Sequence, residues 1–114
     1  MQKNIPLKAF NTFGIAANAA YFAAFSSIAD LESLPGPDAG LPTIILGGGS
    51  NILLTADVNG WVLKNEIKGI EVTGEDSEFV YVKAGAGEPW HPFVLYCIEN
   101  NWGGVENLAL IPGN

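Results

Sequence analysis

The sequence predicts an α+β protein built as two small lobes. Its 114 residues are enough for one small domain. Along the chain the local patterns run strand, helix, strands, hairpin, helix and a final apolar segment. This mixed order favours α+β or α/β. We place the seam between the lobes around residues 65–69, which divides the chain into residues 1–66 and 67–114.

The first lobe is expected to begin with an extended lead-in, residues 1–20. Residues 11–14, Asn-Thr-Phe-Gly, have the composition of a turn within it. The apolar run 19–25 predicts a strand. Ser27 can then cap a short helix, because apolar residues recur after it at helical spacing. The sequence Pro-Gly-Pro at 35–37 is expected to end that helix.

Two further strands are predicted in the first lobe. Thr43–Leu46 shows no polar alternation, and such a strand is usually buried on both faces. Residues 47–51 interrupt it. Residues 52–54 then resume the apolar character, with a pattern closer to a strand than to an exposed helix. The next strand is predicted at residues 61–63, Trp-Val-Leu.

The second lobe is predicted to open with a β-hairpin. Residues 70–73 alternate with a period of two, and residues 74–76 can turn the chain. Residues 79–82, Phe-Val-Tyr-Val, are rich in strand formers and are expected to pair with the first strand. The sequence Gly-Ala-Gly at 85–87 then breaks the hairpin.

A second helix is predicted with Pro89 in its first position. Its apolar face, at helical spacing, consists of Trp90, Phe93, Val94, Cys97 and Ile98. Two asparagines at 100–101 and two glycines at 103–104 end it. Residues 108–111 are expected to form a last buried segment before the final Pro-Gly-Asn.

Composition excludes several classes of partner. All five basic residues are lysines, against twelve acidic residues, so the formal net charge is −7. Binding to duplex nucleic acid needs a cationic stripe, and binding to a membrane surface needs a basic amphipathic segment. The chain has neither, and no apolar run is long enough to cross a membrane. A single cysteine, Cys97, rules out an internal disulfide and indicates the reducing cytoplasm.

The most informative segment is Gly47-Gly48-Gly49-Ser50-Asn51, which directly follows an apolar strand. Successive backbone N–H groups in such a turn can form a concave nest that binds anions. A P-loop is excluded because no lysine follows the glycines, and a Rossmann fingerprint is excluded because Ile52 stands in its third glycine position. Two interpretations stay open on the loop alone, a phosphate-binding nest or a plain glycine-rich turn.

The loop belongs to an ordered set of motifs. Residues 11–15, Asn-Thr-Phe-Gly-Ile, precede it, and residues 68–71, Lys-Gly-Ile-Glu, follow it. Residues 85–91 read Gly-Ala-Gly-Glu-Pro-Trp-His, and residues 104–113 read Gly-Val-Glu-Asn-Leu-Ala-Leu-Ile-Pro-Gly. In this order they resemble the N-terminal part of the UDP-N-acetylenolpyruvoylglucosamine reductase family. The resemblance runs through essentially the whole chain.

The resemblance implies a two-lobed FAD-binding domain of the vanillyl-alcohol oxidase type, with FAD held noncovalently. It implies that NADPH reduces the flavin, which passes hydride to the enolpyruvyl group of a UDP-sugar in peptidoglycan synthesis. The residues that it assigns to the cofactor are Ile45, Leu46, Gly47, Gly48, Gly49, Ser50, Asn51, Ile111, Pro112 and Gly113. No metal ligand and no covalent flavin attachment are implied.

Members of that family are much longer than this chain. Their catalytic arginine, proton-donating serine and catalytic glutamate lie in later segments, so the resemblance assigns no catalytic residue here and no substrate domain. The expectation is an FAD-binding N-terminal part that is inactive alone. Two alternatives remain: a stand-alone nucleotide-binding module without catalysis, and a piece that self-associates through uncovered apolar surface.

Single residues near the motifs are mostly interpreted as structural. His91 is expected to be a surface or hydrogen-bonded residue, and Cys97 a core residue. Glu88 suits the N-terminus of the second helix, where negative charge is favoured. Glu106 is interpreted as structural. The three tryptophans, Trp61, Trp90 and Trp102, are expected in the core or at the seam.

Overall fold

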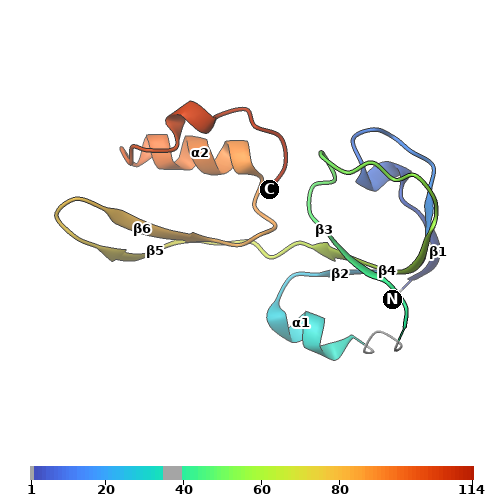
Figure 1. Cartoon of the computed structure of the whole chain (residues 1–114). Helices are drawn as coiled ribbons and strands as arrows, with labels where there is room; N and C mark the ends of the chain where they lie inside the picture. The colour runs from blue at the N-terminus through green and yellow to red at the C-terminus, as the bar shows by residue number, and fades with distance from the viewer. Residues whose placement is uncertain (1, 35–39) are drawn as a thin grey trace.

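A computed structural model describes residues 2–34 and 40–114, and it separates the strands into two sheets (Figure 1). The first sheet holds β1 (Gln2–Pro6), β2 (Asn18–Phe25), β3 (Thr43–Leu46) and β4 (Val58–Asn65). The second holds β5 (Ile70–Glu75) and β6 (Val80–Ala84). The helices are α1 (Ile28–Ser33) and α2 (Trp90–Glu99), and 3₁₀ turns lie at η1 (Lys8–Phe10) and η2 (Glu106–Leu108). The expected helix stop at 35–37 lies outside the described residues.

The first sheet has the strand order β1-β2-β4-β3. β2, β4 and β3 are parallel, and β1 pairs antiparallel with the outer side of β2. α1 lies in the connection from β2 to β3, and Ser27 caps it as predicted, with its Oγ 3.0 Å from the backbone nitrogen of Asp30. The core of this sheet consists of Leu7, Ala19, Phe22, Leu46, Val58 and Val62.

The extended lead-in begins with a strand, β1, which was not predicted separately because its few apolar residues and Pro6 give no strand pattern. Two other expectations for this lobe are wrong. β3 is an edge strand rather than one buried on both faces, so Leu46 is buried while Ile45 is 56% exposed. Residues 52–54 pair with no described strand and run as an irregular segment back to β4. Hydrophobic content alone does not distinguish an edge strand, a central strand and an irregular apolar segment, because it carries no information about neighbouring strands.

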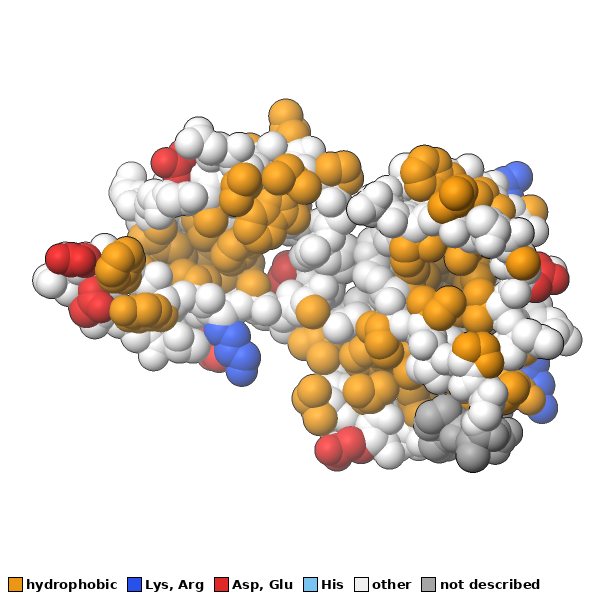
Figure 2. Space-filling model, viewed as in Figure 1, with side chains coloured by type: hydrophobic (Ala, Val, Ile, Leu, Met, Phe, Trp, Pro, Cys, Tyr) orange, Lys and Arg blue, Asp and Glu red, His pale blue; other side chains and the backbone are white. Residues whose placement is uncertain are grey.

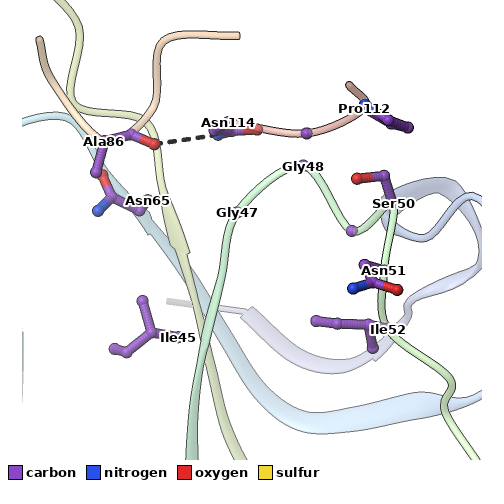
Figure 3. Close-up of a pocket in the computed structure, with 12 residues that line it drawn as sticks. Ile45, Gly47, Gly48, Ser50, Asn51, Ile52, Asn65, Ala86, Pro112 and Asn114 are labelled. Atoms are coloured by element: carbon purple, nitrogen blue, oxygen red, sulfur yellow. Dashed lines mark hydrogen bonds between the residues drawn. The ribbon is translucent and has the colours of Figure 1, made fainter. Parts of the chain in front are cut away.

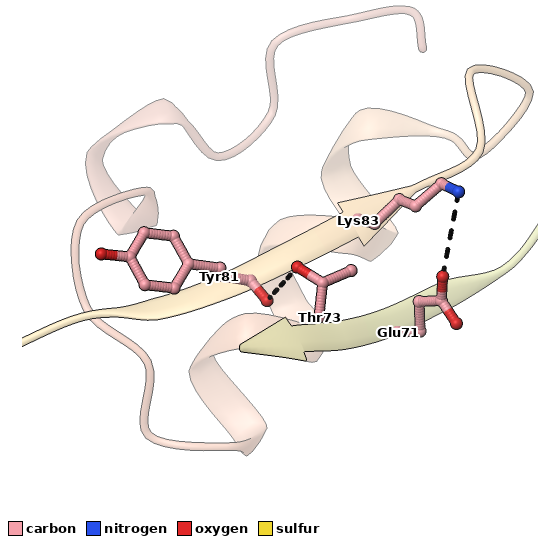
Figure 4. Close-up of polar contacts among 4 residues, drawn as sticks. All are labelled: Glu71, Thr73, Tyr81 and Lys83. Atoms are coloured by element: carbon pink, nitrogen blue, oxygen red, sulfur yellow. Dashed lines mark hydrogen bonds and ion pairs between the residues drawn. The ribbon is translucent and has the colours of Figure 1, made fainter. Parts of the chain in front are cut away.

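The second sheet is the predicted hairpin (Figure 4). Its turn comes later along the chain than expected. Asp76 makes the turn, because its Oδ1 accepts hydrogen bonds from the N–H groups of Glu78 (2.9 Å) and Phe79 (2.7 Å). Gly74, expected in the turn, lies instead within β5 beside a shift in register. An exposed ion pair between Lys83 Nζ and Glu71 (3.9 Å) joins the two strands further along.

α2 forms as predicted, but Pro89 is its N-cap and Trp90 its first residue. Val94 and Cys97 on the predicted apolar face are buried. The helix ends at Asn100 and Asn101, the latter with φ of +59°. The segment 108–111 is not buried as expected. It runs over the surface beside α2, with Leu110 77% exposed at a φ of +66°.

The connection from β4 to β5, residues 66–69, pairs with residues 85–88, which lead from β6 to α2. The N–H groups of Gly85 and Gly87 donate to the carbonyls of Gly69 (2.8 Å) and Ile67 (2.7 Å). A Cβ added to Gly87 would lie 2.6 Å from the Glu66 carbonyl carbon, so this close approach requires glycine. Glu88 closes the connection by accepting from the N–H of Gly69 at 2.8 Å. Glu88 was expected to interact with the N-terminus of α2, and its hydrogen-bond partner is instead Gly69.

The surface of both lobes carries exposed apolar side chains (Figure 2). Orange side chains gather in the space-filling view over the lobe that holds α2 and the hairpin, and over the first sheet. Among residues 2–34 and 40–114, no helix is long and apolar enough to cross a bilayer.

Candidate functional site

The glycine loop and the C-terminal Pro-Gly-Asn segment meet at one pocket of about 380 Å³ (Figure 3). This volume lies within the ~300–1,000 Å³ range of small-molecule sites. The loop follows edge strand β3, so it lies at the carboxyl end of a parallel strand. The pocket is lined by Ile45, Gly47, Gly48, Gly49, Ser50, Asn51, Ile52, Asn65, Ala86, Pro112, Gly113 and Asn114.

Gly49 gives the loop its shape. Its φ is +70°, whereas Gly48 and Ser50 beside it have no positive φ. A change in the sign of φ between neighbours curls the backbone so that its N–H groups converge, which is the geometry of an anion nest. A Cβ at Gly49 would lie 1.9 Å from the carbonyl oxygen of Phe10, so no other residue fits this packing.

Gly48 lies against the C-terminal segment on the other side of the loop. A Cβ added to it would stand 2.6 Å from Asn114 Oδ1 and 3.5 Å from the Cα of Gly113. Gly113 itself lies over Ser50, because a Cβ there would be 2.9 Å from the Ser50 Oγ. The Asn114 side chain reaches across the pocket and donates to the carbonyl of Ala86 at 3.2 Å (Figure 3).

The pocket combines apolar and polar lining groups, without a charged side chain among its described lining residues. Among the described residues, no lysine, aspartate or glutamate lines it. Its polar groups are the Ser50 hydroxyl, the amides of Asn51, Asn65 and Asn114, and the loop backbone. Within the described part of the chain, the N–H groups of Gly48, Ser50 and Asn51 donate no hydrogen bond to another residue. Such converging donors suit a phosphate oxygen, which accepts several hydrogen bonds at once.

Most of the residues assigned to the cofactor by resemblance lie together here. Ile45, residues 47–51, Pro112 and Gly113 all line the pocket. Leu46 does not, because its side chain points into the core and is 5% exposed. Ile111 is 48% exposed and lies outside the lining. A single Cβ added to Gly48 would fill the space beside the loop, and unpaired backbone N–H groups line that space. Such a space fits the diphosphate of a dinucleotide.

Four lining residues were missed from the sequence: Ile52, Asn65, Ala86 and Asn114. Ala86 lies within the Gly-Ala-Gly motif at 85–87, and Asn65 lies at the proposed seam. Ala86 and Asn65 therefore each lie in a segment that the sequence had marked. Their approach to the glycine loop depends on the positions of β4 and of the segments that follow the two sheets, which the sequence does not give. Asn65 also accepts from the N–H of Ile67 at 3.0 Å, which begins the connection to the hairpin.

The remaining marked residues have structural contacts. His91 Nδ1 accepts from the N–H of Leu110 at 3.0 Å, and Trp90 Nε1 donates to the Leu108 carbonyl at 2.8 Å. Both bonds hold the C-terminal segment against α2. The Glu106 carboxylate accepts from the N–H of Gly104 at 2.6 Å. The N–H groups of Glu106 itself and of Gly104 lower the pKa of this carboxyl.

Neither His91 nor Cys97 contributes to a metal site. No group of three histidine, cysteine or acidic side chains comes together among residues 2–34 and 40–114. Burial raises the pKa of the Cys97 thiol and keeps it protonated, as expected of a core cysteine. Trp61 is likewise a core residue, 5% exposed and stacked on Tyr21.

Fold and pocket together describe a small α+β unit whose glycine-rich loop suits a phosphate group. The model of the FAD binding domain family matches residues 22–114, which include the whole glycine loop and the C-terminal segment. The chain belongs to this FAD-binding domain family. The α+β, FAD-binding fold expected from the sequence is therefore confirmed.

Within that class the chain is similar to one enzyme in particular, UDP-N-acetylenolpyruvoylglucosamine reductase. The protein of that name from Amoebophilus asiaticus is 50% identical over 99% of this chain. The one from Flavobacterium johnsoniae is 48% identical over the whole chain. The crystal structure of the Thermus caldophilus reductase has the same fold, with a TM-score of 0.70, 22% identity and 97% of this chain covered. The resemblance predicted from the motifs is confirmed.

The chain is short beside these proteins. It covers 34% of the length of the Amoebophilus and Flavobacterium reductases and 38% of the Thermus chain. The matched part holds the glycine loop and the Pro-Gly-Asn segment. The comparison therefore places the chain in the FAD binding domain family and aligns it with about a third of each of these reductases.

Proposed function

We propose that the pocket between residues 47–51 and 112–114 holds the diphosphate of noncovalently bound FAD. The observation that carries this proposal is the meeting of two distant segments around free backbone donors, with Gly49 at a position that only glycine fits. The side-chain amides of Asn51 and Asn114 and the Ser50 hydroxyl add neutral hydrogen-bonding groups. A neutral cradle of this kind holds a diphosphate without a cationic side chain, which agrees with a net charge of −7.

We further infer that the chain serves a longer, NADPH-dependent reductase acting on a UDP-sugar enolpyruvyl ether in peptidoglycan synthesis. Bound FAD supplies hydride transfer in such an enzyme. Similarity of about 50% to reductases of that name supports the assignment. This chain contains no arginine, so it offers no bidentate clamp for the UDP diphosphate of the substrate. Its own part is to bind and orient the cofactor, and alone it is inactive.

A cytoplasmic location belongs to the same proposal. The single cysteine is free and buried, as in proteins of reducing compartments. The acidic balance of the chain also supports a small-molecule ligand rather than a nucleic acid or an anionic membrane surface.

The proposal is tested by titrating the purified chain with FAD and following flavin fluorescence. The wild-type chain is expected to bind. Gly48→Ala is expected to weaken binding at least about tenfold, because its Cβ enters the cradle and displaces the Asn114 amide. Gly103→Ala is the matched control, since a Cβ there meets nothing within 4 Å. A wild-type chain without affinity for FAD overturns the proposal.

The inactivity of the chain is tested with NADPH and the enolpyruvyl substrate. The FAD-loaded chain is expected to oxidise no NADPH in a substrate-dependent manner. Substrate-dependent turnover would show that the catalytic groups lie within these 114 residues, against this part of the proposal.

A further inference from the structure

Asn11 is the one polar residue in the buried set of the described chain, with 7% of its surface exposed. Its Nδ2 donates to the carbonyls of Leu7 (2.7 Å) and Ile15 (3.2 Å), and its Oδ1 accepts from the N–H of Ile15 (3.0 Å). Three hydrogen bonds to one buried side chain fix the turn at residues 11–14 from within. The turn also closes through its backbone, with the N–H of Gly14 3.1 Å from the Asn11 carbonyl.

This turn is anchored to the core of the first sheet. Leu7 is 2% exposed, and the ring of Phe10 stacks on Phe22 of β2 with 4.7 Å between their centroids. Leu7 and Phe10, which both precede Asn11, are therefore held by packing against the sheet.

The turn touches the glycine loop at Gly49. The N–H of Thr12 donates to the Gly49 carbonyl at 3.0 Å, and the Phe10 carbonyl lies where a Gly49 Cβ would be. Residues 10–12 do not line the pocket, whereas Gly113 and Asn114 contact the loop from the pocket side. The loop is thus held between the turn and the C-terminal segment.

The bond from Thr12 decides where a loop donor points. In a trans peptide the carbonyl of one residue and the N–H of the next point in opposite directions. Fixing the Gly49 carbonyl toward Thr12 therefore turns the N–H of Ser50 away from residues 10–12. Ser50 lines the pocket, so its N–H is presented on the ligand side.

We propose that residues 10–12 brace the glycine loop in its phosphate-binding conformation, and that Asn11 is the positioning residue of this brace. The inference rests on the proposed binding of a diphosphate at the loop. Asn11 touches no ligand and acts through Thr12 and Gly49. Because the loop is shaped before the ligand arrives, binding does not have to order it.

The test compares ADP with adenosine, which lacks the diphosphate, on the whole chain by calorimetry. Asn11→Ala is expected to lower the ratio of ADP affinity to adenosine affinity at least about tenfold. Asn59→Ala, which truncates an exposed asparagine on β4, is expected to leave the ratio unchanged. A merely structural role for Asn11 would weaken both ligands alike and leave the ratio as it is, which would overturn the brace.

Amide hydrogen exchange on the wild-type chain keeps the inference testable where the variant does not fold. ADP is expected to slow exchange at Thr12, although Thr12 lies outside the pocket, because ligand and brace favour the same loop conformation. Unchanged exchange at Thr12 in a chain that binds ADP overturns the brace and leaves the proposed function standing. A wild-type chain that binds neither ADP nor FAD overturns the proposed function and the brace with it.

Discussion

Gly49 is the residue on which the shape of the site depends most. Two separate effects are expected to destabilise the chain when this glycine is replaced. Its φ of +70° disfavours any side chain, and its Cα lies against the Phe10 carbonyl. Gly14 has a similar φ of +64° but open space around it. Gly14→Ala is expected to destabilise the chain by about 1–2 kcal/mol from backbone conformation alone. Gly49→Ala is expected to destabilise it clearly more. Urea unfolding measures both, and equal losses would contradict the close packing.

Cys97 should react slowly in the native chain. Burial raises the pKa of its thiol, so at a given pH the folded chain holds less thiolate than the unfolded one. The raised pKa also means that the protonated thiol favours the fold below the unfolded pKa, a contribution lost as pH rises through the folded value. The check is the rate of thiol modification as a function of pH, with and without urea. Native reaction as fast as that of the unfolded chain would contradict burial.

At the residue scale, the sequence motifs predicted most of the residues that gather at the pocket. They did not predict contacts between residues that are distant in the sequence. Gly48 and Gly113 were assigned to one site because both lie in motifs of one family, and the pocket unites them. Leu46 was assigned with them, yet alternation along β3 turns it into the core. Glu88 was assigned to a helix N-terminus, but its partner is Gly69 across the connection between the sheets. Such long-range partners have no local signature in the sequence.

At the element scale the hairpin β5–β6 is expected to loosen in acid through Asp76. The Tyr81 hydroxyl donates to the Asp76 carboxylate at 2.7 Å, and this bond, followed by those from Glu78 and Phe79, lowers the pKa of Asp76. A lowered pKa means that the ionised carboxylate favours the folded turn above its unfolded value of 3.8. That contribution is lost as pH falls through the folded value. NMR titration of Asp76 and amide exchange of the turn check this.

The control for that prediction is the ion pair Lys83–Glu71 on the same hairpin (Figure 4). Its side chains are 73% and 66% exposed, so solvent and salt screen their attraction. Lys83→Met is expected to change the thermal unfolding midpoint little. Asp76→Ala should increase exchange at the turn more than Lys83→Met does. The reverse order would show that the ion pair, rather than the Asp76 turn, holds the hairpin.

Helices and strands were predicted well where the sequence has a strong hydrophobic periodicity. They were predicted poorly where contacts with neighbouring elements determine the structure. α1, α2, β2 and the hairpin all have clear patterns, and the structure contains each of them. β1 was missed because its pairing with β2, rather than its composition, makes it a strand. Residues 108–111 were expected to be buried on composition alone. They lie exposed because their hydrogen bonds to Trp90 and His91 hold them along the outside of α2.

At the scale of the whole molecule, composition and structure give one account of the apolar content. With 48% hydrophobic residues, the chain leaves large side chains exposed in both lobes (Figure 2). On α2 these include Leu95 and Ile98, and on the hairpin Phe79 and Tyr81. The reductases that the chain resembles are about three times as long, since it covers 34% of two of them. We propose that in the isolated chain these side chains drive self-association.

Self-association is expected to increase with salt concentration and to decrease when an exposed apolar side chain of α2 is replaced by a polar one. The net charge of −7 opposes contact between copies, and salt screens that repulsion while leaving apolar contact intact. Light scattering is therefore expected to show a larger mean mass at higher concentration and in 1 M rather than 0.1 M salt. Ile98→Gln, at a position 45% exposed on α2, should lower the mass. Ile28→Gln, 61% exposed on α1, is the matched control in the other lobe. A monomer at high concentration and high salt would contradict the proposal, and equal effects of the two variants would contradict its assignment to α2.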